Sequence, residues 1–172
     1  MRQSARMSLR GSAVAAAIAF VVTVFASPAW SRAAKPVKCH EMTEALAKAL
    51  FDEWNKALQQ TPDKVVQTYT TDAILLPTFE NGPLIGHKDI RTYFVHFLEK
   101  HPFGRVDTRA IIPAGCNMGV VAGLYTFTVD EGTTRVDSPA RYTYVYTYNE
   151  KAGRWLIAHH HSSARPQKSA AK

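Results

Sequence analysis

The chain has 172 residues and a formal net charge of +7, from 21 lysines and arginines against 14 aspartates and glutamates. Nine basic residues and no acidic residue lie in 1–38 and 165–172; taking these nine from +7 leaves −2 for residues 39–164. A folded nucleic-acid-binding domain carries its lysines and arginines clustered on its own surface, so this composition excludes that class and predicts no nucleic-acid partner.

The first 33 residues have the pattern of an export signal. Three arginines precede an apolar run at 13–26, and small residues follow it. The run is shorter than the roughly 18 apolar residues of a spanning helix, so we expect a signal peptide over 1–33, cleaved between Ala29 and Ala34. An uncleaved membrane anchor is the alternative. After cleavage, the protein would be exported to the periplasm or the extracellular space, with no membrane segment left.

Two cysteines, Cys39 and Cys116, remain in the expected mature chain. An even count in an oxidising compartment favours a disulfide, and two unpaired buried thiols are the alternative. Closing so long a loop would stabilise the fold by on the order of 4 kcal/mol.

The first half of the domain is mainly helical by its periodicity. Apolar residues recur every three or four positions in 42–60 and again in 87–101, which predicts two amphipathic helices. A shorter helix is expected at 63–69, because Pro62 suits a first helical turn. Residues 73–77 are typical of a short buried strand, and the turn-rich segment 79–86 is expected to be a loop.

The second half is expected to be all strand. The segments 108–113 and 117–129 are rich in β-branched residues, a turn follows at 130–133, and 141–148 with 154–161 form a long hairpin. Helices followed by antiparallel strands predict an α+β fold in which the N-terminal helices pack on a curved antiparallel sheet, with space for a pocket between them.

The hairpin's first arm alternates tyrosines with other residues, so the tyrosines share one face of the sheet. We expect this face to point outward and to drive self-association, because it is too apolar to leave bare. The alternative is that the tyrosines face the helices. They are Tyr142, Tyr144, Tyr146 and Tyr148.

The hairpin's second arm ends in three consecutive histidines, and unbroken alternation places His159 and His161 on one face with Trp155 and Ile157. Two imidazoles two residues apart can bind one metal ion, but no third ligand is apparent in the paired arm. Hydrogen-bonded histidines at a strand end are therefore the favoured interpretation, and no metal and no cofactor are predicted.

Two motifs carry a family resemblance. The segment FENGPLIGHKDIRTYFVHFL and the ending GRWLIAHHHSS resemble the association domain of calcium/calmodulin-dependent protein kinase II, within the nuclear transport factor 2-like, or SnoaL-like, superfamily. The resemblance covers 39–166 and leaves 167–172 as a disordered tail. It implies a cone-shaped fold and a homo-oligomer, a dimer or higher. No glycine-rich loop, H-R-D or D-F-G of a kinase occurs in the sequence. Ser162 stands where the kinase domain has a pocket arginine.

A ligand pocket is predicted from the hairpin register. If Tyr148 pairs with Arg154, then Arg141 lies opposite His161 and close to His159, and the three cationic or imidazole groups would bind a small carboxylate or phosphate. The predicted ligand-binding residues are Arg109, Arg141, His159, His161, Tyr93 and Tyr125.

Three function classes follow from these residues. We favour a periplasmic binding or assembly module with a small anion in its pocket. The alternative is an enzyme of the ketosteroid isomerase or polyketide cyclase type that uses His159 or His161 as general base, with Tyr93 or Tyr125 polarising a carbonyl. The lack of a well-placed acid disfavours it. A metal-binding protein is the third class.

Overall fold

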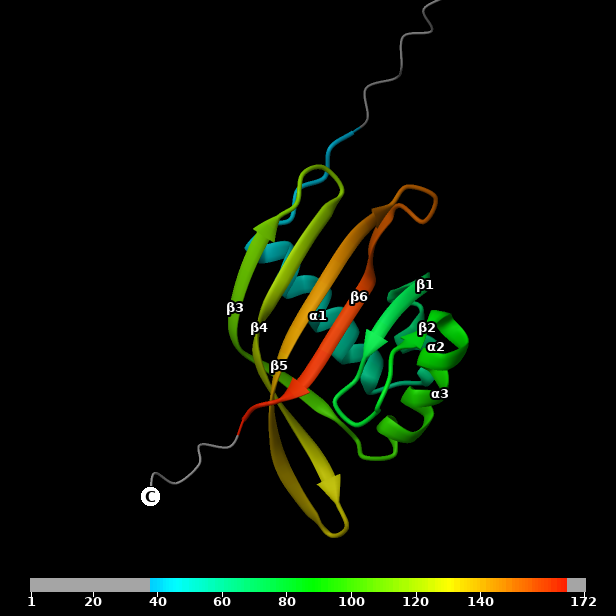
Figure 1. Ribbon diagram of the computed structural model, residues 1–172, viewed down its shortest axis with the longest axis vertical. Coiled ribbons are helices and arrows are strands. Elements are labelled where there is room, and N and C mark those ends of the chain that lie inside the picture. Colours follow the sequence, from blue (N-terminus) through cyan, green and yellow to red (C-terminus); the bar gives the residue numbers. More distant parts are fainter. Residues whose placement is uncertain (1–37, 167–172) are drawn as a thin grey trace, which may run out of the picture. The chain divides into compact units, whose positions relative to one another are not determined.

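The computed structural model describes residues 38–166, so the predicted signal peptide and the predicted disordered tail lie outside the described residues. The described part folds into helices and a single sheet (Figure 1). The helices are α1 (Glu44–Leu58), α2 (Pro62–Val66) and α3 (Gly86–Leu98). The strands are β1 (Tyr69–Leu76), β2 (Leu84–Ile85), β3 (Phe103–Pro113), β4 (Met118–Glu131), β5 (Thr134–Asn149) and β6 (Arg154–Ala164). Within this part, no helix has the length and apolar character to cross a membrane.

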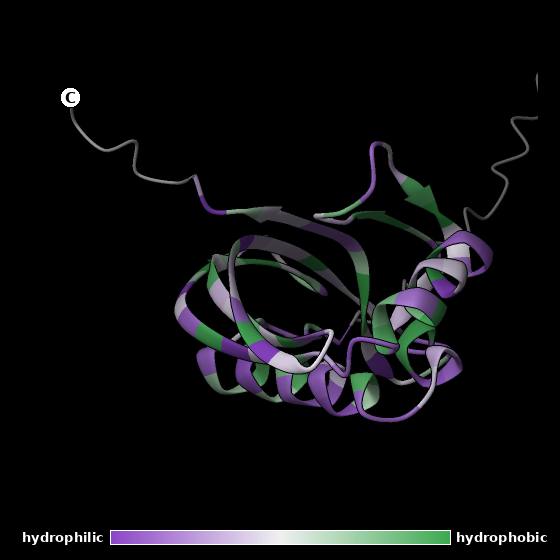
Figure 2. Ribbon diagram, turned by 90° about the horizontal axis from the view of Figure 1, so that it is seen from below, coloured by the Kyte–Doolittle hydropathy of each residue, from purple (hydrophilic) through white to green (hydrophobic). Residues whose placement is uncertain are grey.

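The sheet has the strand order β2-β1-β6-β5-β4-β3 and curls over α1 (Figure 2). All neighbouring strands are antiparallel except β1 and β6, which run parallel. The α+β class with N-terminal helices on a curved sheet is therefore confirmed, with one parallel pair that the sequence did not indicate. The predicted loop 79–86 also contains the two-residue strand β2, which extends the sheet beyond β1.

Helix α1 begins where Thr43 caps it, since the threonine side chain accepts a hydrogen bond from the amide of Leu46 at 3.2 Å. Its apolar face packs on the sheet, with Trp54 at the centre and only 1 % exposed. The indole lies edge-on to Phe127 and Tyr144 from the sheet and to Phe94 from α3, at ring-centroid distances of 6.1, 5.9 and 6.3 Å. Trp54 thus joins α1, α3 and the sheet in one core.

The tyrosines of β5 face this core, so the predicted outer tyrosine face is wrong. Tyr142, Tyr144 and Tyr146 are 4 %, 1 % and 2 % exposed. Their common face was predicted correctly from the alternation, but alternation does not say which face a helix will cover. Tyr148, at the end of the row, stacks on His40 at a centroid distance of 3.7 Å.

A β-bulge interrupts the hairpin and changes its register. Tyr148 pairs with Trp155 rather than Arg154, and Tyr146 pairs with Ile157, but the next residue of β5, Val145, pairs with His159. The residue between them, Ala158, is therefore extra, and an extra residue reverses which side chains of β6 face inward. Beyond the bulge, His160 faces the core, and the predicted face shared by Trp155, Ile157, His159 and His161 is wrong.

The predicted disulfide between Cys39 and Cys116 is present, with Cα atoms 4.9 Å apart. It joins the segment before α1 to the turn between β3 and β4. Hydrogen bonds reinforce the junction, because the amide of His40 donates to Asn117 Oδ1 at 3.0 Å and the amide of Asn117 donates to the His40 carbonyl at 2.9 Å.

Candidate functional site

A narrow cavity lies between the inner face of the sheet and the helices α1 and α3. Its volume is about 30 Å³, room for roughly two water molecules. None of its lining residues is Asp, Glu, Lys or Arg, and most are aromatic or aliphatic. The polar lining residues are Thr78, Tyr93, Tyr125, Ser138, His160 and Ser162.

His160 is the central polar group of the cavity and is 3 % exposed. Its ring stacks on Tyr144 at a centroid distance of 4.2 Å and meets the edge of Trp54 at 5.5 Å. Its Nδ1 lies 2.9 Å from the Tyr69 hydroxyl, and its Nε2 lies 3.5 Å from the Tyr125 hydroxyl. Burial, with a smaller contribution from His159 and His161, lowers the pKa of His160 to about 3. The imidazole is therefore neutral at neutral pH.

The hydrogen bonds continue from Tyr125 towards the surface. The Tyr125 hydroxyl donates to Ser162 Oγ at 2.5 Å, and Ser162 Oγ lies 2.7 Å from Thr78 Oγ1. Burial raises the pKa of Tyr125, so its phenol stays protonated as a donor. Thr78 follows β1 and is partly exposed, whereas the other groups are buried.

The structure separates the six predicted ligand-binding residues. Tyr93 and Tyr125 both line the cavity. Arg109 on β3 faces α1 but lies outside the cavity lining: its Nη1 donates to Glu44 Oε1 at 2.7 Å, and its side chain is 13 % exposed. Its buried Nε has no hydrogen-bond partner within the described part of the chain. Arg141 is exposed on the outer face of the sheet, where its Nε donates to Ser163 Oγ at 3.2 Å.

His159 and His161 also lie on the outer face, opposite Val145 and Thr143 of β5. Arg141 pairs with Ser163, so the expected pairing with His161 is wrong, because the bulge and the turn together move β6 by two residues relative to the prediction. The three groups do not meet at the cavity. A general base supplied to the cavity by His159 or His161 has no support from this arrangement.

Sequence reasoning missed four polar or aromatic groups at the site: Trp54, Tyr69, Thr78 and His160. His160 was assigned to the wrong face because nothing in the local sequence marks Ala158 as a bulge. Tyr69 and Trp54 are 15 residues apart and meet only in the tertiary structure. Two signals were available: Ser162 stands where the resembled kinase domain has a pocket arginine, and His160, two residues before it, shares its face wherever the strand alternates regularly.

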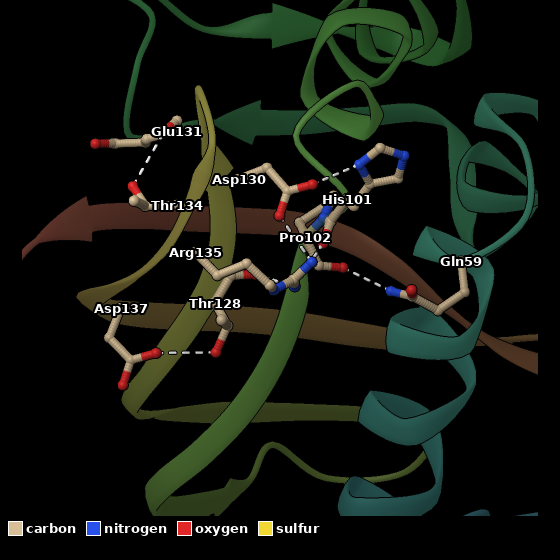
Figure 3. Close-up of polar contacts among 9 residues, drawn as sticks. All are labelled: Gln59, His101, Pro102, Thr128, Asp130, Glu131, Thr134, Arg135 and Asp137. Carbon is tan, nitrogen blue, oxygen red and sulfur yellow. Dashed lines mark hydrogen bonds and ion pairs between the residues drawn. The ribbon is translucent and has the colours of Figure 1, made fainter.

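A polar network fixes the β4–β5 hairpin beside the cavity (Figure 3). Asp130 accepts from Arg135 Nη1 at 2.8 Å and lies 2.8 Å from His101 Nδ1, while Arg135 Nη2 donates to the carbonyl oxygens of His101 and Thr128. Gln59 of α1 donates to the Pro102 carbonyl at 2.6 Å. The network holds the neighbouring cavity residues of β4 and β5 in place.

We expect Arg135→Ala to lower the free energy of unfolding by about 1 kcal/mol, because several hydrogen bonds from one half-exposed guanidinium are lost together. Urea unfolding would measure it. Arg105→Ala is the matched control, since that arginine is more exposed and contacts Asp107 at 3.4 Å. Equal losses of unfolding free energy in the two variants would contradict the role given to the network.

A curved sheet that wraps a long helix and leaves a cavity against a second helix places this domain in the nuclear transport factor 2-like class. The family model of the calcium/calmodulin dependent protein kinase II association domain matches residues 43–166, and the chain belongs to this family. No curated protein matches the sequence.

Solved structures agree with this assignment. One from Xanthomonas campestris that carries the same family description is 40 % identical, covers 78 % of this chain and 94 % of its own, and has a TM-score of 0.69. A nuclear transport factor 2-like protein of unknown function from Pseudomonas putida is 14 % identical, with 77 % and 95 % coverage and a TM-score of 0.59. A ketosteroid isomerase-like protein from Erwinia carotovora is 15 % identical, with 73 % and 100 % coverage and a TM-score of 0.57. The last two share the fold.

Proposed function

We propose that this protein is an exported association-domain module that self-associates through the outer face of its sheet and holds a small molecule in its cavity. Membership of the association-domain family supports self-association, and the disulfide supports an oxidising compartment outside the cytoplasm. The cavity supports ligand binding.

The observation that carries self-association is one row of side chains on the outer face. It has six members, one on each strand, and each is the direct cross-strand partner of the next. Five of the six are apolar. In strand order they are Ile85, Ile74, His159, Val145, Val120 and Ile112. The three isoleucines are 58 %, 40 % and 62 % exposed.

The helices of the described domain pack on the opposite face of the sheet, so none of them covers this row (Figure 2). A second copy of the chain suits the row, because an extended apolar surface on one copy can pack against the same surface on the other. Self-association would then remove from water the isoleucines that one copy leaves exposed.

Sedimentation velocity of the mature protein at micromolar concentrations tests this proposal. We expect a dimer or larger species for the wild type and association weakened about 10-fold or more by Ile112→Glu, because a carboxylate would be buried in the apolar contact. Ile112 is mostly exposed in one copy, so the variant should fold normally.

Phe103→Glu is the matched control, since Phe103 lies on the same strand at 51 % exposure but is outside the row. A monomeric wild type, or equal effects of the two substitutions, would contradict the proposed interface.

The ligand that suits the cavity is neutral. An anion was expected from Arg141, His159 and His161, but these side chains lie on the outer face. Within the cavity the lining offers no cation to offset the desolvation of a carboxylate, whereas its aromatic rings favour an uncharged apolar body.

A further inference from the structure

The hydrogen bonds around His160 form a series in which each group donates to the next, and Trp54 determines which end donates first. An indole N–H can only donate, and Trp54 Nε1 donates to the Tyr69 hydroxyl oxygen at 3.1 Å. The single proton of that hydroxyl is then free to point at His160 Nδ1, 2.9 Å away. We infer that Nδ1 accepts this proton, so that the neutral imidazole carries its own proton on Nε2.

The same direction continues to the mouth of the cavity. The Nε2 proton faces the Tyr125 hydroxyl oxygen across a long contact of 3.5 Å, and Tyr125 donates to Ser162 at 2.5 Å. Ser162 accepts there, so its proton is free for Thr78 at 2.7 Å. With Thr78 as the acceptor of that proton, its own hydroxyl proton is the one left without an acceptor among these groups.

We propose that Thr78 presents this proton to the carbonyl oxygen of a small neutral ligand, such as a ketone, an aldehyde or an amide, in the cavity. The inference rests on the proposed function and names the ligand class of that site. The burial of the groups behind Thr78 supports it, since Tyr69, Tyr125 and His160 are 1 %, 0 % and 3 % exposed and are thus held in place without competition from water.

The rest of the lining fits an uncharged carbonyl compound of few atoms. The rings of Phe94, Phe97 and Phe127 form an apolar wall, and the cavity's about 30 Å³, with room for roughly two water molecules, limits the enclosed part of a ligand to about two heavy atoms, such as its carbonyl group. A carboxylate of the same size would lose its hydration without gaining a cationic partner among the lining residues.

The direction of the hydrogen bonds is tested first, without any ligand. Long-range proton–nitrogen NMR spectra of the ¹⁵N-labelled mature protein distinguish the two neutral imidazole tautomers. We expect His160 to be protonated on Nε2 in the wild type. Trp54→Phe removes the indole donor to Tyr69 and should shift His160 towards a mixture of tautomers, whereas Trp155→Phe, at another buried tryptophan, should leave it unchanged. An Nδ1-protonated His160 in the wild type would overturn the proposal.

The ligand class is tested by titrating acetone and, separately, acetate, while the NMR signals of the cavity residues are followed. We expect saturable binding of acetone, about 3- to 10-fold weaker in Thr78→Val, which replaces the hydroxyl by a methyl group of similar size. Thr92→Val is the matched control, because Thr92 lies on the exposed side of α3 and bonds only to the Lys88 carbonyl.

Three results would overturn this assignment, and they leave different parts of the proposed function intact. Acetate binding in preference to acetone would reject the neutral carbonyl class but retain a ligand cavity. Saturable binding of neither compound would reject ligand binding in the cavity, and acetone binding unchanged in Thr78→Val would reject the donor role of Thr78. Self-association is judged separately by sedimentation.

Discussion

Lowering the pH from 7 to 4 should lower the free energy of unfolding by about 3 kcal/mol through the protonation of His160 alone. The pKa of His160 is about 3 in the folded protein against 6.5 for an unperturbed histidine, and each pH unit between them corresponds to about 1.36 kcal/mol. Burial is the main cause, because the protonated ring would lie among aromatic side chains with no carboxylate beside it.

The sign follows from proton binding in the two states. Below about pH 6.5 the unfolded chain takes up a proton on this histidine, while the folded protein does not until about pH 3. Stability is therefore full above pH 6.5, falls as the pH is lowered through this window and levels off below it. The titratable groups that face the ring are Tyr69, Tyr125 and Tyr144, and burial raises the pKa of each, so they stay neutral across the window.

Urea unfolding between pH 7 and pH 4 would measure the effect. His160→Gln keeps a polar side chain that does not titrate, so its stability should fall by about 3 kcal/mol less than that of the wild type over this range. The same change at the exposed neighbour, His161→Gln, should leave the wild-type pH dependence in place. Parallel pH profiles for His160→Gln and the wild type would show that the buried imidazole does not carry the acid sensitivity.

Replacing both cysteines by serine should lower the free energy of unfolding by about 4 kcal/mol. The disulfide closes a loop with a sequence separation of 77, and the loss of that constraint increases the conformational entropy of the unfolded chain. The unfolded chain should also become more expanded, so the dependence of stability on denaturant should steepen.

Guanidinium unfolding of Cys39→Ser/Cys116→Ser would measure both changes, and the wild type unfolded in the presence of a reductant should match the double variant. The folded junction keeps the paired hydrogen bonds between His40 and Asn117, so we expect the variant to fold. An unfolding midpoint equal to that of the oxidised wild type would show that these non-covalent contacts alone hold the segment, and that the disulfide contributes little.

The elements themselves could be predicted because their signals are local. The apolar period of 42–60 predicted α1, and the cap at Thr43 and the buried Trp54 follow from it. The segment 79–86 was harder to predict, since β2 is a strand only because it pairs with β1. The parallel pairing of β1 with β6 joins segments more than 80 residues apart, and no local pattern encodes such a contact.

The site was harder to predict than the fold. Tyr93 and Tyr125 were placed in the pocket, but the two arginines were assigned there because a buried guanidinium needs a partner. Arg109 has one in Glu44, from the first turn of α1, and Arg141 is exposed and needs none. These outcomes depend on where α1 lies across the sheet. The sequences of the strands alone do not encode that position.

By itself the sequence determined the α+β class, the family, the single pairing open to a disulfide, and the sharing of a face by the tyrosines of β5. Each depends on composition, on a motif or on a period of two or 3.6 residues, which the chain carries locally. The tertiary structure decided which face is the core, because α1 and Trp54 cover only one. It also decided that His160 lies inside and its two neighbours outside, because one extra residue at Ala158 shifts the alternation of everything that follows it in β6.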